Sequence, residues 1–355
     1  MSGAEEFAER IFGSTLAAMD LFSMHLGDRL GYYRALAEEP ATAGQLAERT
    51  GTDARYAREW LEQQAVTGIV EVLDETNDTD ARRFWLPRGH AEVLTNETSL
   101  SFMAPLPRML AAVGVQLPTL LDAYRRGGGV SWGRFGTDMR EAQADVNRPP
   151  FQQLLGRQYF RHVPDVFERL SRGPSIVADL GCGAGWSSIG IAQAFPQAVV
   201  HGYDVDSPTV ELARRNASEA GVTDRVTFEV VDATDPTLSG DHDLVIAIEC
   251  VHDLARPVEF LATMKRLAGD EGAVIVGDMN VAETFTAPGD DIERLMYGYS
   301  ILICLPDGRS HPDSAATGTA MRPETLRRYA TEAGFSELEV LPIETDFWRF
   351  YRLRR

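Results

Sequence analysis

The sequence has few positive charges and almost no lysine. Its 34 basic residues are outnumbered by 53 acidic ones, and the formal net charge is −19. Lys265 is the only lysine, so arginine supplies nearly all of the positive charge. A surface this acidic repels the phosphates of nucleic acids and of anionic membranes. We therefore expect neither nucleic acid nor membrane among the partners of this chain.

Cysteine is scarce as well. Cys182, Cys250 and Cys304 lie far apart, without the paired spacing of a disulfide framework or a zinc site. Reduced thiols suit a cytoplasmic protein, and the acidic start Met1–Arg10 does not have the pattern of a signal peptide. The uncharged run Leu180–Val200 contains four glycines and a proline, which excludes a membrane span. The sequence thus predicts a cytoplasmic protein without a metal site.

A glycine-rich turn stands near the middle of the sequence. Ile176–Leu180 predicts a short buried strand, and Ser187–Phe195 is compatible with a helix. Between them glycine recurs at every second position, at Gly181, Gly183 and Gly185. Glycine lets the backbone turn sharply and lets a ligand touch the main chain, and the helix start adds free N–H groups. The stretch therefore predicts a nucleotide-type site at the carboxyl edge of a parallel sheet.

The residues around these glycines distinguish between nucleotides. The NAD fingerprint requires a glycine where this sequence has Trp186 or Ser188. Asp179, two residues before Gly181, completes the pattern D-x-G-x-G-x-G. A carboxylate at this place suits a cationic ligand and is unfavourable beside a pyrophosphate. An NAD-dependent dehydrogenase is therefore the weaker hypothesis.

Further strands follow the turn at regular spacing. Four segments predict them: Val199–Asp204, Val226–Val231, Asp243–Ile248 and Ala273–Asp278. Asp204 lies 19 residues after Gly185, where dinucleotide-binding folds place a carboxylate for the ribose. Strands and helices that alternate in this way predict an α/β fold with a doubly wound parallel sheet.

From about Phe160 to Asp278 the order of these motifs resembles that of the class I S-adenosylmethionine (SAM) methyltransferases. The resemblance implies a Rossmann-like sheet of seven strands, whose last, antiparallel hairpin is expected from 337–342 and 347–353. It also implies that SAM is the cofactor and S-adenosylhomocysteine the product. The residues implied to bind the cofactor are Asp179, Gly181, Cys182, Gly183, Gly185, Asp204, Val205, Asp232, Ala233, Glu249 and Tyr159.

The first hundred residues predict a separate helical domain. Apolar residues at spacings of three to five indicate an amphipathic helix over about Ala4–Leu30. Tyr32–Val72 has the pattern of a winged helix-turn-helix, with helices capped by Thr42 and by Thr52 or Asp53. Two wing strands are expected after the last of these helices, joined by an acidic loop.

This domain allows two interpretations. It resembles the winged-helix domain with which several small-molecule O-methyltransferases dimerise, and the apolar stripe of the first helix favours a homodimer. A helix-turn-helix also suggests DNA binding. However, the first 100 residues hold 9 arginines and 18 acidic residues, which argues against that. A winged-helix transcriptional regulator with a SAM-binding sensor domain is therefore kept as the alternative function.

The length of 355 residues is enough for more than one hydrophobic core. We expect a winged-helix domain over 1–100 and a helical linker that contributes to the substrate pocket over 101–165. A SAM-binding domain over 166–355 is expected to carry a helical insertion at about 282–320. Prolines predict that the linker forms short helices, with a break near Pro149-Pro150. The insertion lies at the carboxyl edge of the sheet, where it would cover the substrate.

Methyl transfer to a hydroxyl requires a group that removes the proton. His252 follows the fourth predicted strand, and His252-Asp253 matches the catalytic His-Asp pair of plant-type O-methyltransferases. A histidine near its reference pKa accepts a phenol proton at neutral pH. The alternative is a structural role, because His252-Asp-Leu-Ala-Arg-Pro257 also fits a motif of methyltransferases that lack a histidine base. Glu249 is a second polar group expected near the methyl.

Two other histidines are not expected in the site. His201 lies within the second predicted strand and is expected in the core, whereas His311 lies in a polar loop and is expected to be exposed. The leading hypothesis is a SAM-dependent methyltransferase that acts on a small hydrophobic or aromatic acceptor, with O-methylation favoured. A SAM-binding protein that does not transfer methyl groups is a third hypothesis.

Overall fold

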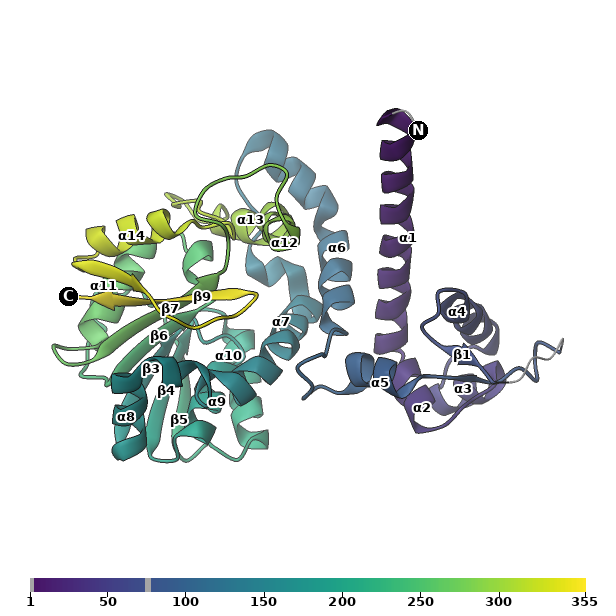
Figure 1. The fold of residues 1–355 in the computed structure, drawn as a ribbon, viewed down its shortest axis with the longest axis horizontal. Coiled ribbons are helices and arrows are strands. Elements are labelled where there is room, and N and C mark those ends of the chain that lie inside the picture. The colour runs from purple at the N-terminus through teal and green to yellow at the C-terminus, as the bar shows by residue number, and fades with distance from the viewer. Residues whose placement is uncertain (1–2, 74–77) are drawn as a thin grey trace. The chain divides into compact units, whose positions relative to one another are not determined.

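The computed structural model describes residues 3–73 and 78–355 of the chain (Figure 1). The chain divides into two compact units, Met1–Gly114 with Glu141–Pro149, and Val115–Arg140 with Pro150–Arg355. The two units are defined by which parts of the backbone pack together. The division by function expected from the sequence, at 1–100, 101–165 and 166–355, remains a prediction. No helix in the described ranges is long and apolar enough to cross a membrane.

The first unit begins with the predicted amphipathic helix, α1 (Gly3–Arg29). The helix-turn-helix, its antiparallel wing and one further helix follow: α2 (Tyr32–Glu38), α3 (Ala43–Thr50), α4 (Ala54–Val66), β1 (Glu71–Val72), β2 (Phe84–Trp85) and α5 (Arg88–Thr95). Thr42 and Gln45 form a capping box on α3, and Asp53 accepts two backbone hydrogen bonds at the start of α4. The capping predictions are confirmed; residues 74–77 of the expected wing loop lie outside the described residues.

Aromatic rings form the core of the helix-turn-helix. The Trp60 ring of α4 meets Tyr32 and Tyr33 edge-on, with centroid distances of 4.8 and 5.2 Å. The indole N–H of Trp60 donates to the carbonyl of Ser23 at 2.9 Å, which anchors the second half of α1. The apolar side chains along the rest of α1 are exposed: Phe7, Ile11, Phe12, Leu16, Met19 and Phe22.

Two segments are more helical than the sequence predicted. The proline-rich linker contains one long helix, α6 (Pro105–Arg126), where short helices were expected. Pro118 lies inside α6. Because proline has no backbone N–H, one hydrogen bond of the helix is missing there, while the turns on either side persist. The predicted break near Pro149-Pro150 is also wrong, because α7 (Gly136–Pro150) continues into a π-helical turn, η2 (Phe151–Leu155). Such wider turns let a helix continue past a disturbed hydrogen-bond ladder.

The second unit is built on the predicted seven-stranded sheet, in the order β5-β4-β3-β6-β7-β9-β8. Its strands are β3 (Ser175–Leu180), β4 (Ala198–Asp204), β5 (Val226–Val230), β6 (Leu244–Ile248), β7 (Ala273–Met279), β8 (Glu337–Val340) and β9 (Trp348–Arg354). Strands β3 to β7 are parallel, and β9 is antiparallel to β7 and β8. The Rossmann-like fold and its closing hairpin are confirmed. The strand order reverses between β3 and β6, where α/β sheets bind their ligands.

Helices cover the sheet (Figure 1). They are α8 (Pro164–Arg172), α9 (Trp186–Ala194), α10 (Ser207–Glu219), α11 (Pro257–Leu267) and α14 (Pro323–Glu332). Leu261 and Met264 of α11 and Leu326 of α14 are fully buried in one cluster with Val245 and Val276 of the sheet. Because β6 and β7 are buried on both sides, their sequences are nearly continuous apolar runs.

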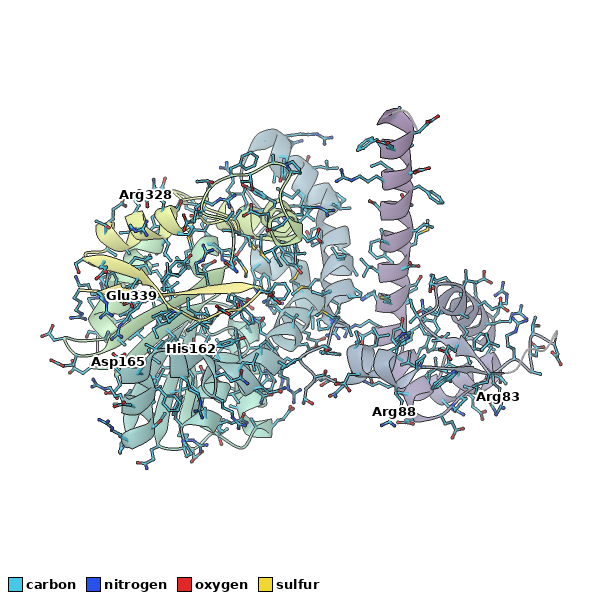
Figure 2. The ribbon with its side chains drawn as sticks, viewed as in Figure 1. Arg83, Arg88, His162, Asp165, Arg328 and Glu339 are labelled. Atoms are coloured by element: carbon cyan, nitrogen blue, oxygen red, sulfur yellow. The ribbon has the colours of Figure 1, made fainter. Side chains whose placement is uncertain are left out.

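Arginine–carboxylate pairs fasten the closing hairpin. Asp165 of α8 accepts hydrogen bonds from Arg352 of β9 at 2.8 and 2.6 Å, and Glu339 of β8 accepts one from Arg354 at 2.9 Å (Figure 2). Hydrogen bonds from Arg352 hold the pKa of Asp165 below its ordinary value. The first pair thereby attaches the hairpin to α8, and the second joins the two strands of the hairpin to each other.

The predicted insertion after β7 is helical. It consists of α12 (Asp291–Tyr299), the π-helical turn η5 (Ser300–Cys304) and α13 (Leu305–Gly308). Short 3₁₀ turns elsewhere in this unit are η1 (Trp132–Phe135), η3 (Tyr159–His162) and η4 (Val251–Asp253). A Cβ at Gly308 would lie 3.0 Å from the carbonyl of Asp253, and the N–H of Gly318 donates to the carbonyl of His252 at 3.0 Å. The insertion therefore packs on η4, the turn that follows β6.

Candidate active site

The glycine turn joins β3 to α9. Gly181, Gly183 and Gly185 have φ values of 67°, 52° and 81°, a region that favours glycine. A Cβ at Gly185 would stand 2.4 Å from the ring of Phe228, so close packing requires this glycine. A Cβ at Gly183 would meet nothing within 4 Å, so the main chain borders open space there. Burial raises the pKa of the buried Cys182 well above its ordinary value, so this residue is a neutral thiol.

Asp179 is almost fully buried at the end of β3, with 1% of its surface exposed. Its Oδ2 atom accepts hydrogen bonds from the hydroxyls of Ser187 and Ser188, each at 2.6 Å. Burial raises the pKa of this carboxyl to about 6, although the two hydroxyls favour the charged form. The side chain thus holds the first turn of α9, a role that the sequence pattern did not indicate. Its contact with the methionine end of SAM stays a prediction.

Asp204 ends β4 beside the glycine turn. Its Oδ2 accepts from the N–H of Gly183 and its Oδ1 from the N–H of Asp206, both at 2.9 Å. Burial raises the pKa of Asp204 above its ordinary value. Val205, the next residue, is exposed. Arg140 of α7 pairs with Asp206 at 2.6 Å, a contact that sequence reasoning missed because 66 residues separate the two.

The residues expected around the adenine and the methyl lie at other strand ends. Asp232 follows β5, is largely exposed, and accepts a hydrogen bond from Arg256 at 3.1 Å. Ala233 beside it is buried. Tyr159 in η3 packs its half-buried ring 5.5 Å from that of Phe350 on β9. The structure thus places these side chains individually, and their contacts with a cofactor stay predictions.

Glu249 directly follows β6 in a strained conformation. Its φ is 59°, which is uncommon for a residue with a Cβ. The carboxylate accepts a hydrogen bond from the indole N–H of Trp348, and the backbone N–H donates to Gly277 at 2.9 Å. A backbone of this kind costs about 1–3 kcal/mol and is found mostly at functional sites, where the surroundings hold it. Its position next to β3 is consistent with a role in the site.

His252 lies in η4 and is 2% exposed. Its Nδ1 is 2.7 Å from Oδ1 of Asp278 at the end of β7, and its Nε2 is 3.2 Å from Oδ1 of Asp253. Burial lowers the pKa of His252, but the two carboxylates outweigh burial and hold this pKa well above its ordinary value. The expectation of a histidine near its reference pKa is therefore wrong. Sequence reasoning missed Asp278, although an acid at the end of the fifth predicted strand was a signal for it.

The helical insertion adds two titratable groups to this end of the sheet. Cys304 of η5 lies close to His252 and Asp253, and one ligand-type atom from each of the three falls within 4.8 Å of the others. Asp307 of α13 accepts a hydrogen bond from the N–H of Trp132 at 2.7 Å. Burial and the charge of Asp253 raise the pKa of Asp307 to about 7. Sequence spacing could not reveal this cluster, since its members come from separate elements.

The histidines expected outside the site are outside it. His311 is exposed, as predicted. His201 is only half-buried on β4, so the prediction of a core residue is wrong. Its Nδ1 lies 2.9 Å from the hydroxyl of Thr227 on β5, which gives the ring a polar partner near the surface.

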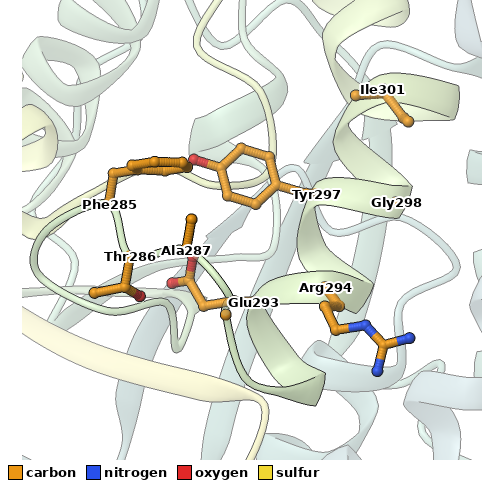
Figure 3. Close-up of a pocket in the computed structure, with 9 residues that line it drawn as sticks. Phe285, Thr286, Ala287, Glu293, Arg294, Tyr297, Gly298 and Ile301 are labelled. Carbon is orange, nitrogen blue, oxygen red and sulfur yellow. The ribbon is translucent and has the colours of Figure 1, made fainter. Parts of the chain in front are cut away.

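A pocket of about 420 Å³ lies between the loop after β7 and α12 (Figure 3). The rings of Phe285 and Tyr297 are nearly perpendicular in its wall, with centroids 6.4 Å apart. Glu293 in the wall is paired with Arg322 at 2.6 Å, so its charge is compensated. Ile301, Thr286 and small residues complete the lining together with Arg294, whose guanidinium is paired with Asp291 at 2.7 Å. The pocket is therefore suited to an apolar or aromatic group.

Comparison with protein families finds two separate matches along the chain. Residues 174–302 match a family model described as a methyltransferase domain. Residues 17–96 match one described as an Rv2258c-like winged HTH domain. The chain carries a class I methyltransferase domain behind a winged helix-turn-helix domain. The prediction of a methyltransferase domain is thereby confirmed.

Similar proteins include methyltransferases from several organisms. Ajmaline N-methyltransferase of Rauvolfia serpentina is 30% identical over 118 residues, which are 33% of this chain and 39% of the relative. The 27-O-demethylrifamycin SV methyltransferase of Amycolatopsis mediterranei is 28% identical over 193 residues, covering 48% and 69%. Human N-acetylserotonin methyltransferase, solved in complex with SAM, is similar in fold, with a TM-score of 0.71, 17% identity, and coverage of 100% and 99%. The chain spans about two fifths of the length of the first curated relatives it matches.

Proposed function

We propose that the whole protein transfers a methyl group from SAM to a small hydrophobic or aromatic acceptor, with a hydroxyl oxygen as the favoured acceptor atom. One observation supports this most strongly. His252 follows β6 and is held by Asp278 at the end of the neighbouring β7, while the glycine turn follows β3 on the other side of β6. A nucleotide-type loop and a buried proton acceptor thus lie at the same edge of one sheet.

The residues at the glycine turn fit SAM. Open space at Gly183 lets a ligand approach the main chain, and the carboxylates of Asp179 and Asp204 suit a cationic ligand. SAM supplies a methyl group that its sulfonium already activates for transfer. We propose as binding residues Asp179, Gly181, Cys182, Gly183, Gly185, Asp204, Val205, Asp232, Ala233, Glu249 and Tyr159.

In the proposed mechanism His252 accepts the proton of the acceptor hydroxyl. Its Nδ1–H donates to Asp278, which leaves Nε2 as the atom that accepts a proton. Asp253 lies beside Nε2 and stabilises the imidazolium that forms. The helical insertion packs on η4 and limits access of water to this pair.

The favoured acceptor atom follows from the buried base. The relatives include ajmaline N-methyltransferase and the 27-O-demethylrifamycin SV methyltransferase, so the family likeness alone does not select nitrogen or oxygen as the acceptor atom. An amine attacks through a free lone pair, whereas a hydroxyl must lose its proton, which is the step that a positioned histidine accelerates. The apolar pocket at Phe285 and Tyr297 supports a hydrophobic or aromatic acceptor, or a part of one.

We also propose a cytoplasmic homodimer that binds no nucleic acid. The exposed apolar stripe of α1 supports an interface with a second copy, because such continuous patches are costly in water. The net charge of −19 supports the absence of nucleic acid and of anionic membrane among the partners.

The test of the cofactor is calorimetry with SAM and, separately, with NAD. We expect SAM alone to bind. Asp204→Ala should weaken SAM binding by about 1.5–3 kcal/mol, the loss of a charge-assisted hydrogen bond. The control is Asp270→Ala, whose side chain is 99% exposed. Binding of NAD, or equal SAM affinity in Asp204→Ala and wild type, would contradict the assignment. A panel of phenols, catechols and hydroxy acids then tests methyl transfer.

The winged HTH match supports a regulator as a second candidate. In that case α4 would have to present free positive charge to DNA. Arg55 pairs with Glu59 at 2.5 Å, and Arg58 lies 3.5 Å from Asp80. These acids compensate the arginines of the would-be recognition helix, so we expect no mobility shift with DNA at moderate salt. A SAM-dependent shift would favour the regulator.

A further inference from the structure

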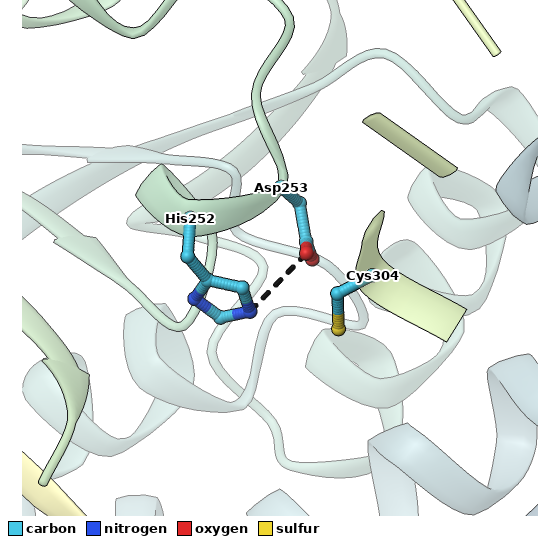
Figure 4. A group of neighbouring side chains, drawn as sticks. All are labelled: His252, Asp253 and Cys304. Carbon is cyan, nitrogen blue, oxygen red and sulfur yellow. Dashed lines mark ion pairs between the residues drawn. The ribbon is translucent and has the colours of Figure 1, made fainter. Parts of the chain in front are cut away.

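Three side chains with metal-ligand chemistry meet at the end of β6. His252 and Asp253 come from η4, and Cys304 comes from η5 of the insertion (Figure 4). One nitrogen, one oxygen and one sulfur ligand atom all lie within 4.8 Å of one another. Cys304 is 51 residues from Asp253, so the helical insertion is what completes the group.

The histidine ring is oriented as in metal sites. Asp278 lies 2.7 Å from Nδ1 of His252, which directs the proton of the neutral ring to Nδ1 and the free lone pair to Nε2. A carboxylate on the far nitrogen is the usual outer partner of a histidine that binds a metal. The Nε2 atom faces Asp253 and Cys304 and is itself buried, since His252 is only 2% exposed.

Some polar atoms of the group are unsatisfied. Oδ1 of Asp253 is buried and forms no hydrogen bond, although it lies 3.2 Å from Nε2 of His252. Oδ2 of Asp278 is buried without a hydrogen-bond partner as well. Buried carboxylate oxygens without partners are costly and rare. A cation between Asp253 and His252 would give Oδ1 of Asp253 the partner that it lacks.

We infer that His252 Nε2, Asp253 Oδ1 and Cys304 Sγ bind a thiophilic divalent cation such as Zn²⁺. Mixed nitrogen, oxygen and sulfur donors suit zinc, and three protein ligands leave a fourth position open. Ligand atoms bound tetrahedrally at 2.0–2.3 Å are separated by roughly 3.3–3.7 Å. The distance of 3.2 Å between His252 and Asp253 already agrees with this, so only Cys304 has to approach.

The cation and a proton compete for the same nitrogen. Cys304 binds the cation as a thiolate and His252 as a neutral ring, so the thiol proton and any proton on Nε2 pass to solvent when the site fills. When Nε2 ligates the ion, His252 can no longer accept the proton of an acceptor. Under the proposed function, occupancy of this site therefore inhibits methyl transfer. The binding itself does not rest on the proposed function.

The test uses the full chain, stripped of metal by a chelator and titrated with Co²⁺ and with Zn²⁺. We expect one Co²⁺ per chain, with a thiolate-to-cobalt charge-transfer band in the near ultraviolet, and displacement by Zn²⁺. Cys304→Ser should abolish the band and weaken Zn²⁺ binding by more than about 10-fold. Removal of a residue that only orients a metal ligand already weakens binding by about that factor, so removal of a ligand should weaken it more. Asp253→Asn should weaken binding while the band remains at saturating Co²⁺.

Cys250→Ser is the matched control. Cys250 is a free cysteine two residues from His252, and its thiol faces the carbonyl of Leu180. This variant should keep the band. Absence of a saturable band, its persistence in Cys304→Ser, or its loss in Cys250→Ser would each overturn the site. If Co²⁺ binds as expected but no acceptor is methylated by the metal-free protein, the metal site stands and the proposed function fails.

Discussion

His252 and Asp179 are both buried, and the pKa of each is raised above its ordinary value, but for opposite reasons. Two carboxylates outweigh burial at His252 and stabilise its positive charge. Burial dominates at Asp179 and destabilises its negative charge, although two serine hydroxyls donate to it. Nearby carboxylates therefore make the histidine a stronger base, and burial makes the aspartate a weaker acid. Both effects depend on neighbours and can be tested by pH.

His252→Gln is expected to lower the turnover of a hydroxyl acceptor by about 10²–10⁴-fold. SAM affinity should change little, because the glycine turn follows β3 whereas His252 follows β6. In wild type the rate should rise with pH, because only the neutral ring accepts a proton. The ascending limb of the pH profile should lie above the ordinary histidine pKa of about 6.5, because the pKa of His252 is raised. Steady-state rates against pH, with a chelator present, provide the measurement.

Asp278→Asn is the companion variant for this prediction. It removes one carboxylate from the ring, so the limb should move to lower pH while the base remains. A structural role of Asp278 alone would lower the rate without moving the limb. If His252→Gln keeps the wild-type rate and pH profile, His252 is a structural residue and the acceptor needs no base.

Asp179 is expected to link stability to pH. Its pKa of about 6 in the folded state exceeds the ordinary value of 3.8, so protonation favours the folded state. The stability that this group contributes is fully present below the ordinary value and is lost as pH rises through 6. Relative to Asp179→Asn, the wild type should lose up to about 3 kcal/mol of unfolding free energy over that interval.

Urea unfolding of both proteins from pH 4 to pH 8 measures this difference. The asparagine keeps an oxygen that can accept from Ser187 or Ser188, so the hydrogen bonding of α9 is largely conserved. The control is Asp270→Asn, which is 99% exposed in its side chain and should follow the wild type. Parallel stability profiles for wild type and Asp179→Asn would show that burial does not control this carboxyl.

At the scale of elements, a substitution in the turn between β3 and α9 should affect both the stability of the fold and the binding of SAM, and the two effects can be measured separately. Gly183→Ala should cost about 1–2 kcal/mol of stability, because its φ of 52° disfavours a Cβ. The new methyl would stand in the open space where we propose that SAM contacts the main chain, so SAM binding should weaken by more than about 10-fold, or 1.4 kcal/mol. Calorimetry and denaturant unfolding measure the two effects separately.

Gly221→Ala is the matched control for the turn. Gly221 follows α10 with a φ of 67°, and a Cβ there also meets nothing within 4 Å. The substitution should have a similar cost in stability and no effect on SAM. Equal SAM affinity in both variants would place the cofactor elsewhere.

At the scale of the whole molecule, the exposed stripe of α1 predicts self-association. Phe12→Asp with Met19→Asp should convert a dimer to a monomer, because the two side chains are 65% and 61% exposed in the single chain. Substitution is a cleaner test than deletion of 1–30, which would also remove Asp28, the buried partner of Arg108 at 2.8 Å. Light scattering at micromolar concentration measures the mass.

Tyr56→Asp is the control for the dimer prediction. Tyr56 lies on α4, outside the stripe, and is 78% exposed. It should leave the mass unchanged. A wild-type protein that is monomeric at micromolar concentration, or a dimer that survives both substitutions in α1, would contradict the assignment of the interface to this helix.

The sequence by itself determined the elements and their order. Apolar periodicity located the strands of the sheet, and Thr42, Asp53 and Gly51 marked helix ends where the structure has them. These signals are local, since caps and turns act within a few residues and each strand shows its own apolar run. The order of the motifs then sufficed to predict the Rossmann-like sheet, the winged helix and the methyltransferase domain. Local signals failed where packing outweighed them, as at Pro118 inside α6.

Only the tertiary structure decided which groups share an environment. Asp278 reaches His252 across 26 residues, and Cys304 reaches Asp253 across 51. The pKa of His252 depends on that first contact, and the proposed cation site depends on the second. Sequence spacing could predict neither contact, because the register of β6 against β7 and the packing of η5 on η4 bring these side chains together. Electrostatic energies vary with distance and burial, and the folded chain alone sets both of these.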